Sequence, residues 1–183
     1  MKYSSCLVLA AVVLVAGLCL IPAASPEPAT VERSVTKSFS AQPGGTLQLA
    51  AQGGQIQVQP AADMVVTIRA RERIHAGTET NADEMLKGLN LSFAQQDNAI
   101  TVRAKYEGTK PVVHSGSWPP VQVDFFITVP TGFSIDLDSG GGRVTVGDLA
   151  GSVRAHTGGG ELNLGRIGNG NDAPTGGGSV RIE

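Results

Sequence analysis

Apolar and polar residues alternate in short segments along most of the chain, with a period of two residues. Such alternation places successive side chains on opposite faces of an extended strand, so that one face can be buried. The segments that show it most clearly are 44–49, 53–58, 64–72 and 121–129. The pattern predicts an all-β fold of half-buried strands, and 121–129 supplies its most apolar face.

One segment between these strands has helical signals. Thr80 or Asn81 is suited to the N-cap, and Asp83 and Glu84 follow where negative charge favours the positive end of a helix. Gly88 is suited to end the helix. We therefore expect one short helix that packs on the sheet.

A hairpin and a loop are expected after the helix. Residues 91–94 and 99–106 form the two predicted strands of the hairpin, with a turn at 96–98. The segment 110–120 is a predicted loop that contains Trp118 and ends in two prolines. Trp118 offers a surface for stacking on a sugar or a partner, together with Tyr106, Phe125 and Phe126; we favour its covering the end of the sheet.

Glycine triplets recur at a fixed spacing in the last third of the chain. They occupy 140–142, 158–160 and 176–178, which are 18 residues apart, and a short alternating strand follows each triplet. Strands at a fixed period, bounded by glycine turns, are typical of a β-solenoid or β-roll, in which equivalent strands stack in parallel about 4.8 Å apart. We predict N-terminal β-sheet layers with one short helix that run into a β-solenoid or β-roll of 18-residue coils.

The repeat predicts which side chains share a column. The expected inward columns are Val144/Leu162/Val180 and Val146/Leu164/Ile182, and the expected outward column is Arg143/Glu161/Ser179. The segment 168–174 breaks the pattern, and we predict a loop there in place of a strand. The sequence stops at Glu183, one strand into a third coil, so the last strand is expected to pair elsewhere, to meet a partner or to continue in a longer chain.

The N-terminal segment has the pattern of an export signal. Lys2 precedes an uncharged apolar run at 6–21, and small residues follow at 22–25. The run is shorter than the roughly 20 residues that span a bilayer. We predict a signal peptide at 1–23 that is cleaved before Ala24; an uncleaved anchor and lipidation at Cys19 are the alternatives.

The predicted signal peptide determines the expected domain boundaries and the expected cellular location of the protein. We expect a flexible lead-in at 24–35 and a single β-solenoid-like domain at 36–183. The protein is expected to be exported to the periplasm, the cell surface or the medium, and to meet the membrane only through its signal segment. Both cysteines, Cys6 and Cys19, lie in the signal, so the mature chain is expected to have no disulfide and no thiolate chemistry.

The composition excludes one class of function and explains the glycine content. The formal net charge is −2, which excludes a large basic surface for nucleic acid. Of the 24 glycines, 15 lie between residues 132 and 183, and nine of these form the three triplets. We therefore attribute the glycine excess to the turns of the repeat.

Two carboxylates are the best candidates for catalysis. Asp136 and Asp138 lie two apart on a predicted strand, so they share a face about 7 Å apart, and such pairs can hydrolyse glycosides. Asp148, Arg154 and His156 are near in sequence. We favour solvated strand faces here and assign no catalytic residue.

Metal and cofactor sites are not expected. The segment 168–172 is similar to the calcium-binding repeat of repeat-in-toxin proteins, but Pro174 stands where that repeat needs an apolar residue, and no second copy follows. His75, His114 and His156 are widely separated, so no zinc ligand set is apparent. We predict no bound metal and no cofactor.

The strand repeat resembles the putative-adhesin domain family of bacterial exported proteins. The likeness rests on the unit at 53–58, on Asp-Phe-Phe-Ile-Thr-Val-Pro at 124–130 and on Ser-Gly-Gly-Gly-Arg-Val-Thr-Val-Gly-Asp-Leu-Ala-Gly-Ser-Val at 139–153, and it covers about residues 36–183. The resemblance implies an exported, mostly β, solenoid-like domain without a catalytic motif.

These observations favour a non-catalytic exported protein of the cell envelope or surface that acts in adhesion or another interaction. A surface protein or a polysaccharide is the expected partner, with self-association at the open C-terminal edge as a further alternative; nucleic acid is not expected. The competing hypotheses are a carbohydrate-active β-solenoid enzyme and a purely structural envelope protein.

Overall fold

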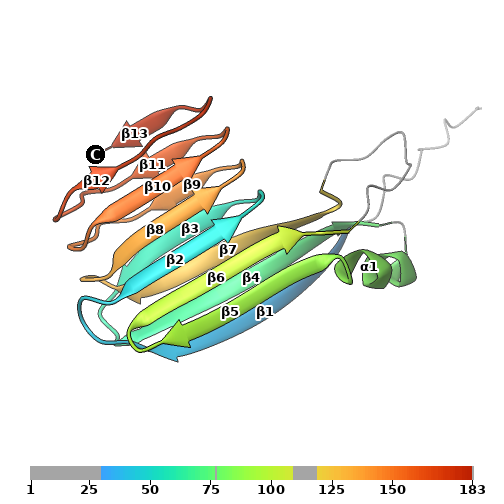
Figure 1. The fold of residues 1–183 in the computed structure, drawn as a ribbon, viewed down its shortest axis with the longest axis horizontal. Coiled ribbons are helices and arrows are strands. Elements are labelled where there is room, and N and C mark those ends of the chain that lie inside the picture. The colour runs from blue at the N-terminus through green and yellow to red at the C-terminus, as the bar shows by residue number, and fades with distance from the viewer. Residues whose placement is uncertain (1–29, 77, 109–118, 183) are drawn as a thin grey trace, which may run out of the picture.

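The chain folds into two sheets that face each other across the main hydrophobic core (Figure 1). The computed structural model describes residues 30–76, 78–108 and 119–182. The seven-stranded sheet A has the order β1-β4-β7-β3-β9-β11-β13, and the six-stranded sheet B has the order β12-β10-β8-β2-β6-β5. The predicted mostly β fold with one short helix is therefore observed as two mixed sheets.

The strands of sheet A are β1 (Thr30–Ser40), β4 (Val65–His75), β7 (Val121–Pro130), β3 (Ile56–Ala61), β9 (Val144–Val146), β11 (Leu162–Leu164) and β13 (Val180–Ile182). Those of sheet B are β12 (Asn171–Asp172), β10 (Val153–Thr157), β8 (Ser134–Ser139), β2 (Thr46–Ala51), β6 (Ala99–Tyr106) and β5 (Leu89–Gln96).

Each sheet combines an antiparallel part with a parallel part. The pairs β1–β4, β4–β7 and β5–β6 are antiparallel, and the last of these is the predicted hairpin. The remaining pairs are parallel, and Figure 1 shows β8 to β13 stacked beyond β2 and β3. β1, β4, β5, β6 and β7 thus have antiparallel neighbours and do not form coils of a solenoid, whereas β2 and β3 pair only in parallel.

The alternation seen in the sequence determines what lies between the sheets. In β7, the residues Val121, Val123, Phe125, Ile127 and Val129 are buried, as the apolar pattern predicts. The other strands contribute alternate residues to the main core, including Leu47, Ile56 and Leu137, whereas Val121 packs in a smaller cluster with Ile74 and Ala82. A fully buried side chain of this size stabilises the fold by about 1.5–3 kcal/mol relative to exposure, so these columns hold the two sheets together.

The predicted pairing of residues 18 apart is observed in the parallel part. Val144 lies beside Leu162, and Leu162 lies beside Val180. Val144 and Leu162 are fully buried, but Val180 is 40% exposed and Ile182 is 51% exposed. The inward columns are therefore correct for the first two positions, while at β13 the core face opens to solvent.

Close approach of the backbone explains the last glycine of each triplet. Gly142 and Gly160 have positive φ values of 104° and 148°, which residues with a side chain rarely adopt. A Cβ on Gly142 would collide with the carbonyl oxygen of Gly54, and one on Gly160 with that of Gly142. Successive turns therefore stack backbone directly on backbone.

Three local predictions need correction. The helix α1 (Glu79–Leu86) begins two or three residues earlier than expected: its N-cap is Thr78, whose extended backbone lets the hydroxyl accept a hydrogen bond from the Asn81 N–H at 3.2 Å. Gly88 does follow the helix end, and its N–H donates to the Met85 carbonyl at 3.1 Å.

The second correction concerns the predicted lead-in at 24–35. β1 begins at Thr30 and pairs with β4 along its whole length, because Val31, Val35 and Phe39 alternate toward the inner face. The third concerns 168–174, where a loop was predicted. The two-residue strand β12 lies there and pairs in parallel with β10, so backbone pairing continues although the apolar alternation is lost.

Several predictions fall on other parts of the chain. The signal at 1–23, most of the loop at 110–120, Trp118 and His114 lie outside the described residues. Within the described ranges, no helix is long and apolar enough to cross a membrane.

The triplet geometry gives a matched pair of variants. Gly160→Ala should lower the free energy of unfolding by about 2 kcal/mol or more, because alanine adds backbone strain and a collision with Gly142. Gly159→Ala should be close to neutral, since a Cβ there meets nothing within 4 Å. Urea unfolding of both variants measures the difference; equal losses would show that the turns do not stack as described.

Candidate functional site

The outer face of sheet B brings together four of the residues singled out in the sequence. Asp136 and Asp138 both point outward from β8, and in β10 Arg154 lies beside Asp136 and His156 beside Asp138. Asp148 is not part of this group. It lies after β9 and accepts three hydrogen bonds from Arg166, at 2.9, 3.2 and 2.9 Å, which lower the pKa of its carboxyl.

Equivalent positions on sheet B form rows across the strands. Thr46, Ser134 and Ser152 make a row of hydroxyls, in which the oxygens of Ser134 and Ser152 are 3.2 Å apart. A second row contains Asp136 and Arg154, and Arg154 lies 3.6 Å from the carboxylate of Asp172. A depression of about 430 Å³ lies over these two rows. It is open, and its lining combines these polar side chains with apolar residues such as Ile135 and Val153.

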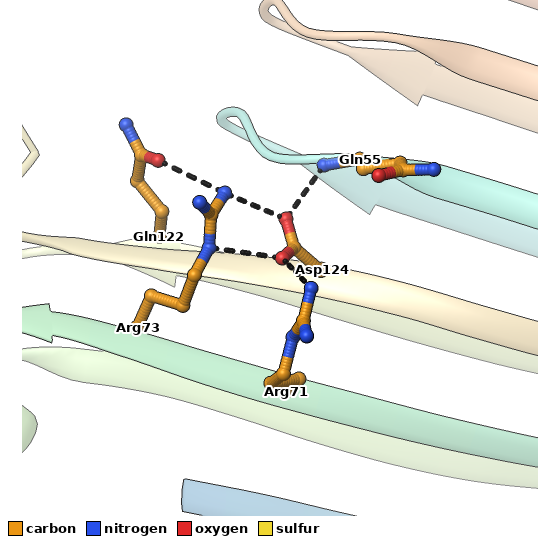
Figure 2. Close-up of polar contacts among 5 residues, drawn as sticks. All are labelled: Gln55, Arg71, Arg73, Gln122 and Asp124. Carbon is orange, nitrogen blue, oxygen red and sulfur yellow. Dashed lines mark hydrogen bonds and ion pairs between the residues drawn. The ribbon is translucent and has the colours of Figure 1, made fainter. Parts of the chain in front are cut away.

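The outer face of sheet A carries a cluster that the sequence analysis missed (Figure 2). We call it the Asp124 cluster, and it consists of Asp124, Arg71, Arg73, Gln55 and Gln122. Asp124 points outward from β7 and is only 1% exposed, because the two arginines and the turn before β3 cover it.

Every oxygen of this buried carboxylate has a donor. Arg71 Nη2 and Arg73 Nε each lie 2.9 Å from Oδ2, while Arg73 Nη2 and the Gln55 backbone N–H donate to Oδ1 at 2.9 and 2.8 Å. Gln122 accepts from Arg73 at 3.3 Å. The cluster joins β4, β7 and β3, so it lies where the antiparallel strands meet the parallel ones. The sequence offers one sign of this cluster, which is an acidic residue within the apolar strand 121–129. The partners of that residue can be identified only once the strand order is known.

A second buried carboxylate lies on the inner side of sheet A. Glu72 in β4 is 8% exposed and lies beside Arg33 of β1. Arg33 directs its guanidinium to Asp83 and Glu79 of α1. Burial raises the pKa of Glu72, and the positive charge of Arg33 offsets only part of this rise.

Ion pairs also connect successive strands of the parallel part. Arg143 lies 2.9 Å from Glu161, as the predicted outward column requires, and the pKa of Glu161 is lowered by a hydrogen bond from Asn163 and by the charge of Arg143. Among the residues that the structure describes, no group of three or more His, Cys, Asp or Glu side chains has the arrangement of a metal site.

We compared the chain with known protein families, sequences and structures. No protein-family model matches the chain, and no curated protein sequence matches it. A putative cell adhesion protein from Clostridium sporogenes has a similar fold, with a TM-score of 0.52 and 10% identity over 83% of this chain and 99% of that one.

Two further solved structures overlap less closely. A putative adhesin from Bacteroides fragilis gives a TM-score of 0.30 at 9% identity, over 82% of this chain and 97% of that one. A putative adhesin from Parabacteroides distasonis gives 0.34 at 11% identity, over 82% and 65%. The similarity to the Clostridium protein shows a common, mostly β fold.

The Asp124 cluster leads to a stability prediction. Asp124→Asn should lower the free energy of unfolding by about 3 kcal/mol, because it leaves two partly buried guanidinium groups without their carboxylate. Asp148→Asn removes an exposed partner of Arg166 and should change stability little. Urea unfolding at neutral pH measures both, and a similar effect of the two variants would contradict the structural role of Asp124.

The buried Glu72 predicts a pH dependence. Its raised pKa means that the folded chain binds the proton more tightly than the unfolded chain, so stability is lost as pH rises from the ordinary glutamate range through the raised pKa. Glu72→Gln should remove this part of the loss, seen as a flatter curve of unfolding free energy as the pH rises above the ordinary glutamate range. Glu32→Gln, at an exposed position of β1, is the control. A Glu72→Gln curve parallel to that of the unchanged protein would refute the assignment.

Proposed function

We propose that this chain is an exported, non-catalytic protein of the cell envelope or surface that acts in adhesion or another interaction. The fold shared with the Clostridium sporogenes protein supports this proposal, and so does the export pattern of Lys2 and the apolar run at 6–21. Membership of the putative-adhesin domain family is part of the proposal. So is the interpretation of the strands from Ser134 onward as coils of a β-solenoid, which their pairing at an offset of 18 residues supports.

The observation that carries the proposal is the form of the outer faces. Polar side chains recur in rows at the strand spacing of about 4.8 Å, on open surfaces with depressions. Such a face suits a ligand that is recognised over a large area, and it does not require a reactive residue. A polysaccharide or a surface protein is the proposed partner.

The C-terminal edge offers a second mode of interaction. Val180 and Ile182 of β13 are exposed, and β13 has a paired strand on one side only among the described residues. Self-association through this edge would bury both side chains and pair the free backbone groups.

A carbohydrate-active enzyme is the alternative function. One observation favours it: Asp136 and Asp138 share the outer face of β8, with Arg154 and His156 directly beside them. Against it stands the open surface, which lacks the enclosed cleft that usually holds a reacting sugar.

The experiment that separates the two functions uses the protein produced by export with its own N-terminal segment. It is tested against a panel of neutral and acidic polysaccharides for binding and for release of reducing ends. We expect binding without turnover, and the same result for Asp136→Asn and Asp138→Asn. Turnover that either variant abolishes would establish the enzyme; failure of every polysaccharide and of surface proteins to bind would refute the interaction module.

A further inference from the structure

One row of side chains crosses the outer face of sheet A. The strand register places six residues side by side, in the order Arg69, Phe126, Gln57, Thr145, Asn163 and Arg181. We call this the Arg69–Arg181 row. Its members come from β4, β7, β3, β9, β11 and β13, so the row extends over about 24 Å at the usual strand spacing.

Two depressions lie along this row. One, of about 420 Å³, is lined by Arg69, Phe126 and Gln57, and the other, of about 300 Å³, by Thr145, Asn163 and Arg181. Gln57 and Thr145 are direct neighbours in the register, so the two depressions adjoin. Together they follow the row across the strands.

The two ends of the row are positively charged. Arg69 and Arg181 are exposed, and neither has a carboxylate within ion-pair distance in the described part of the chain, whereas Arg71 and Arg73 are bound to Asp124. Arg181 does contribute to lowering the pKa of Glu161, but that carboxylate is hydrogen-bonded to Arg143 at 2.9 Å. The acid at the edge of the second depression, Asp148, is likewise bound to Arg166. Both end arginines are thus available to an anionic ligand.

The middle of the row offers hydrogen bonds and an aromatic surface. Gln57 has a side-chain amide and Thr145 a hydroxyl, whereas the Asn163 amide donates to Glu161 and its side-chain oxygen is buried. The half-buried ring of Phe126 lies 5.2 Å from the guanidinium carbons of Arg69 and Arg71. An amide, a hydroxyl and a ring beside cations match a ligand that has many hydroxyl groups and some carboxylates.

We propose that the Arg69–Arg181 row binds a linear acidic polysaccharide, which lies across the strands with uronate carboxylates at the two arginines. The proposal rests on the proposed function and names its ligand class. The strand spacing is close to the advance per sugar of an extended pyranose chain, so successive sugars meet successive strands. An acidic peptide fits less well, because extended peptides bind sheets through free backbone groups at an edge, and the row lies on a face.

The test is titration calorimetry with an oligomannuronate of about six sugars, long enough to span the row. Arg69→Gln and Arg181→Gln should each weaken its binding about tenfold, since each removes a charge-assisted hydrogen bond. Arg103→Gln is the matched control: it removes an exposed arginine, also without an ion pair in the described chain, from the outer face of sheet B. It should change affinity less than about twofold, and thermal melting of each variant verifies folding.

Two further ligands make the ligand class falsifiable. The neutral manno-oligosaccharide of equal length and polyglutamate of similar charge should both bind at least about tenfold more weakly. Equal binding of either, an equal effect of Arg103→Gln, or no binding of oligomannuronate would overturn the inference. If oligomannuronate fails while another polysaccharide or a surface protein binds, the interaction function stands and only this site and ligand class are wrong.

Discussion

The distance between neighbouring strands is the constraint on which the parallel part of this structure depends. Hydrogen-bonded strands lie about 4.8 Å apart, so the turns that connect them must stack at the same distance. At Gly142 and Gly160 this stacking leaves no room for a Cβ above the preceding turn. The 18-residue spacing of the glycines in the sequence therefore reflects the contact between stacked turns. The same 18-residue register aligns the apolar side chains in columns between the sheets.

A second constraint joins this stack to the antiparallel strands. Asp124 is a buried charge, which would be costly without partners, and it receives donors from β4 and from the turn before β3. The Asp124 carboxylate can be buried only if β4, β7 and the turn before β3 stay in these relative positions. The same contacts hold Arg71 beside the ring of Phe126. The cluster thereby determines both the junction of the two parts and the chemistry of the outer face of sheet A.

The sequence predicts the local structure better than the strand order, for physical reasons. Alternation identifies the buried face of β7, and the period of 18 predicts that Val144 lies beside Leu162, because both are properties of nearby residues. The pairing of β1 with β4 and of β4 with β7 depends on contacts between distant segments, which leave no period in the chain. Asp124 was missed for the same reason, since its arginine partners lie some 50 residues earlier. The N-cap at Thr78 was missed because several neighbouring residues can accept the same hydrogen bond.

The register also explains how polar side chains come to form rows on the outer faces. In a parallel stack, any outward residue that recurs at the same place in each strand forms a row without further adjustment, as Thr145, Asn163 and Arg181 do. Extension of that row to Phe126 and Arg69 requires the antiparallel strands to align with the stack, and the Asp124 cluster holds them in that alignment. The ion cluster around the buried Asp124 thus helps to determine the length of the surface that a linear ligand would meet.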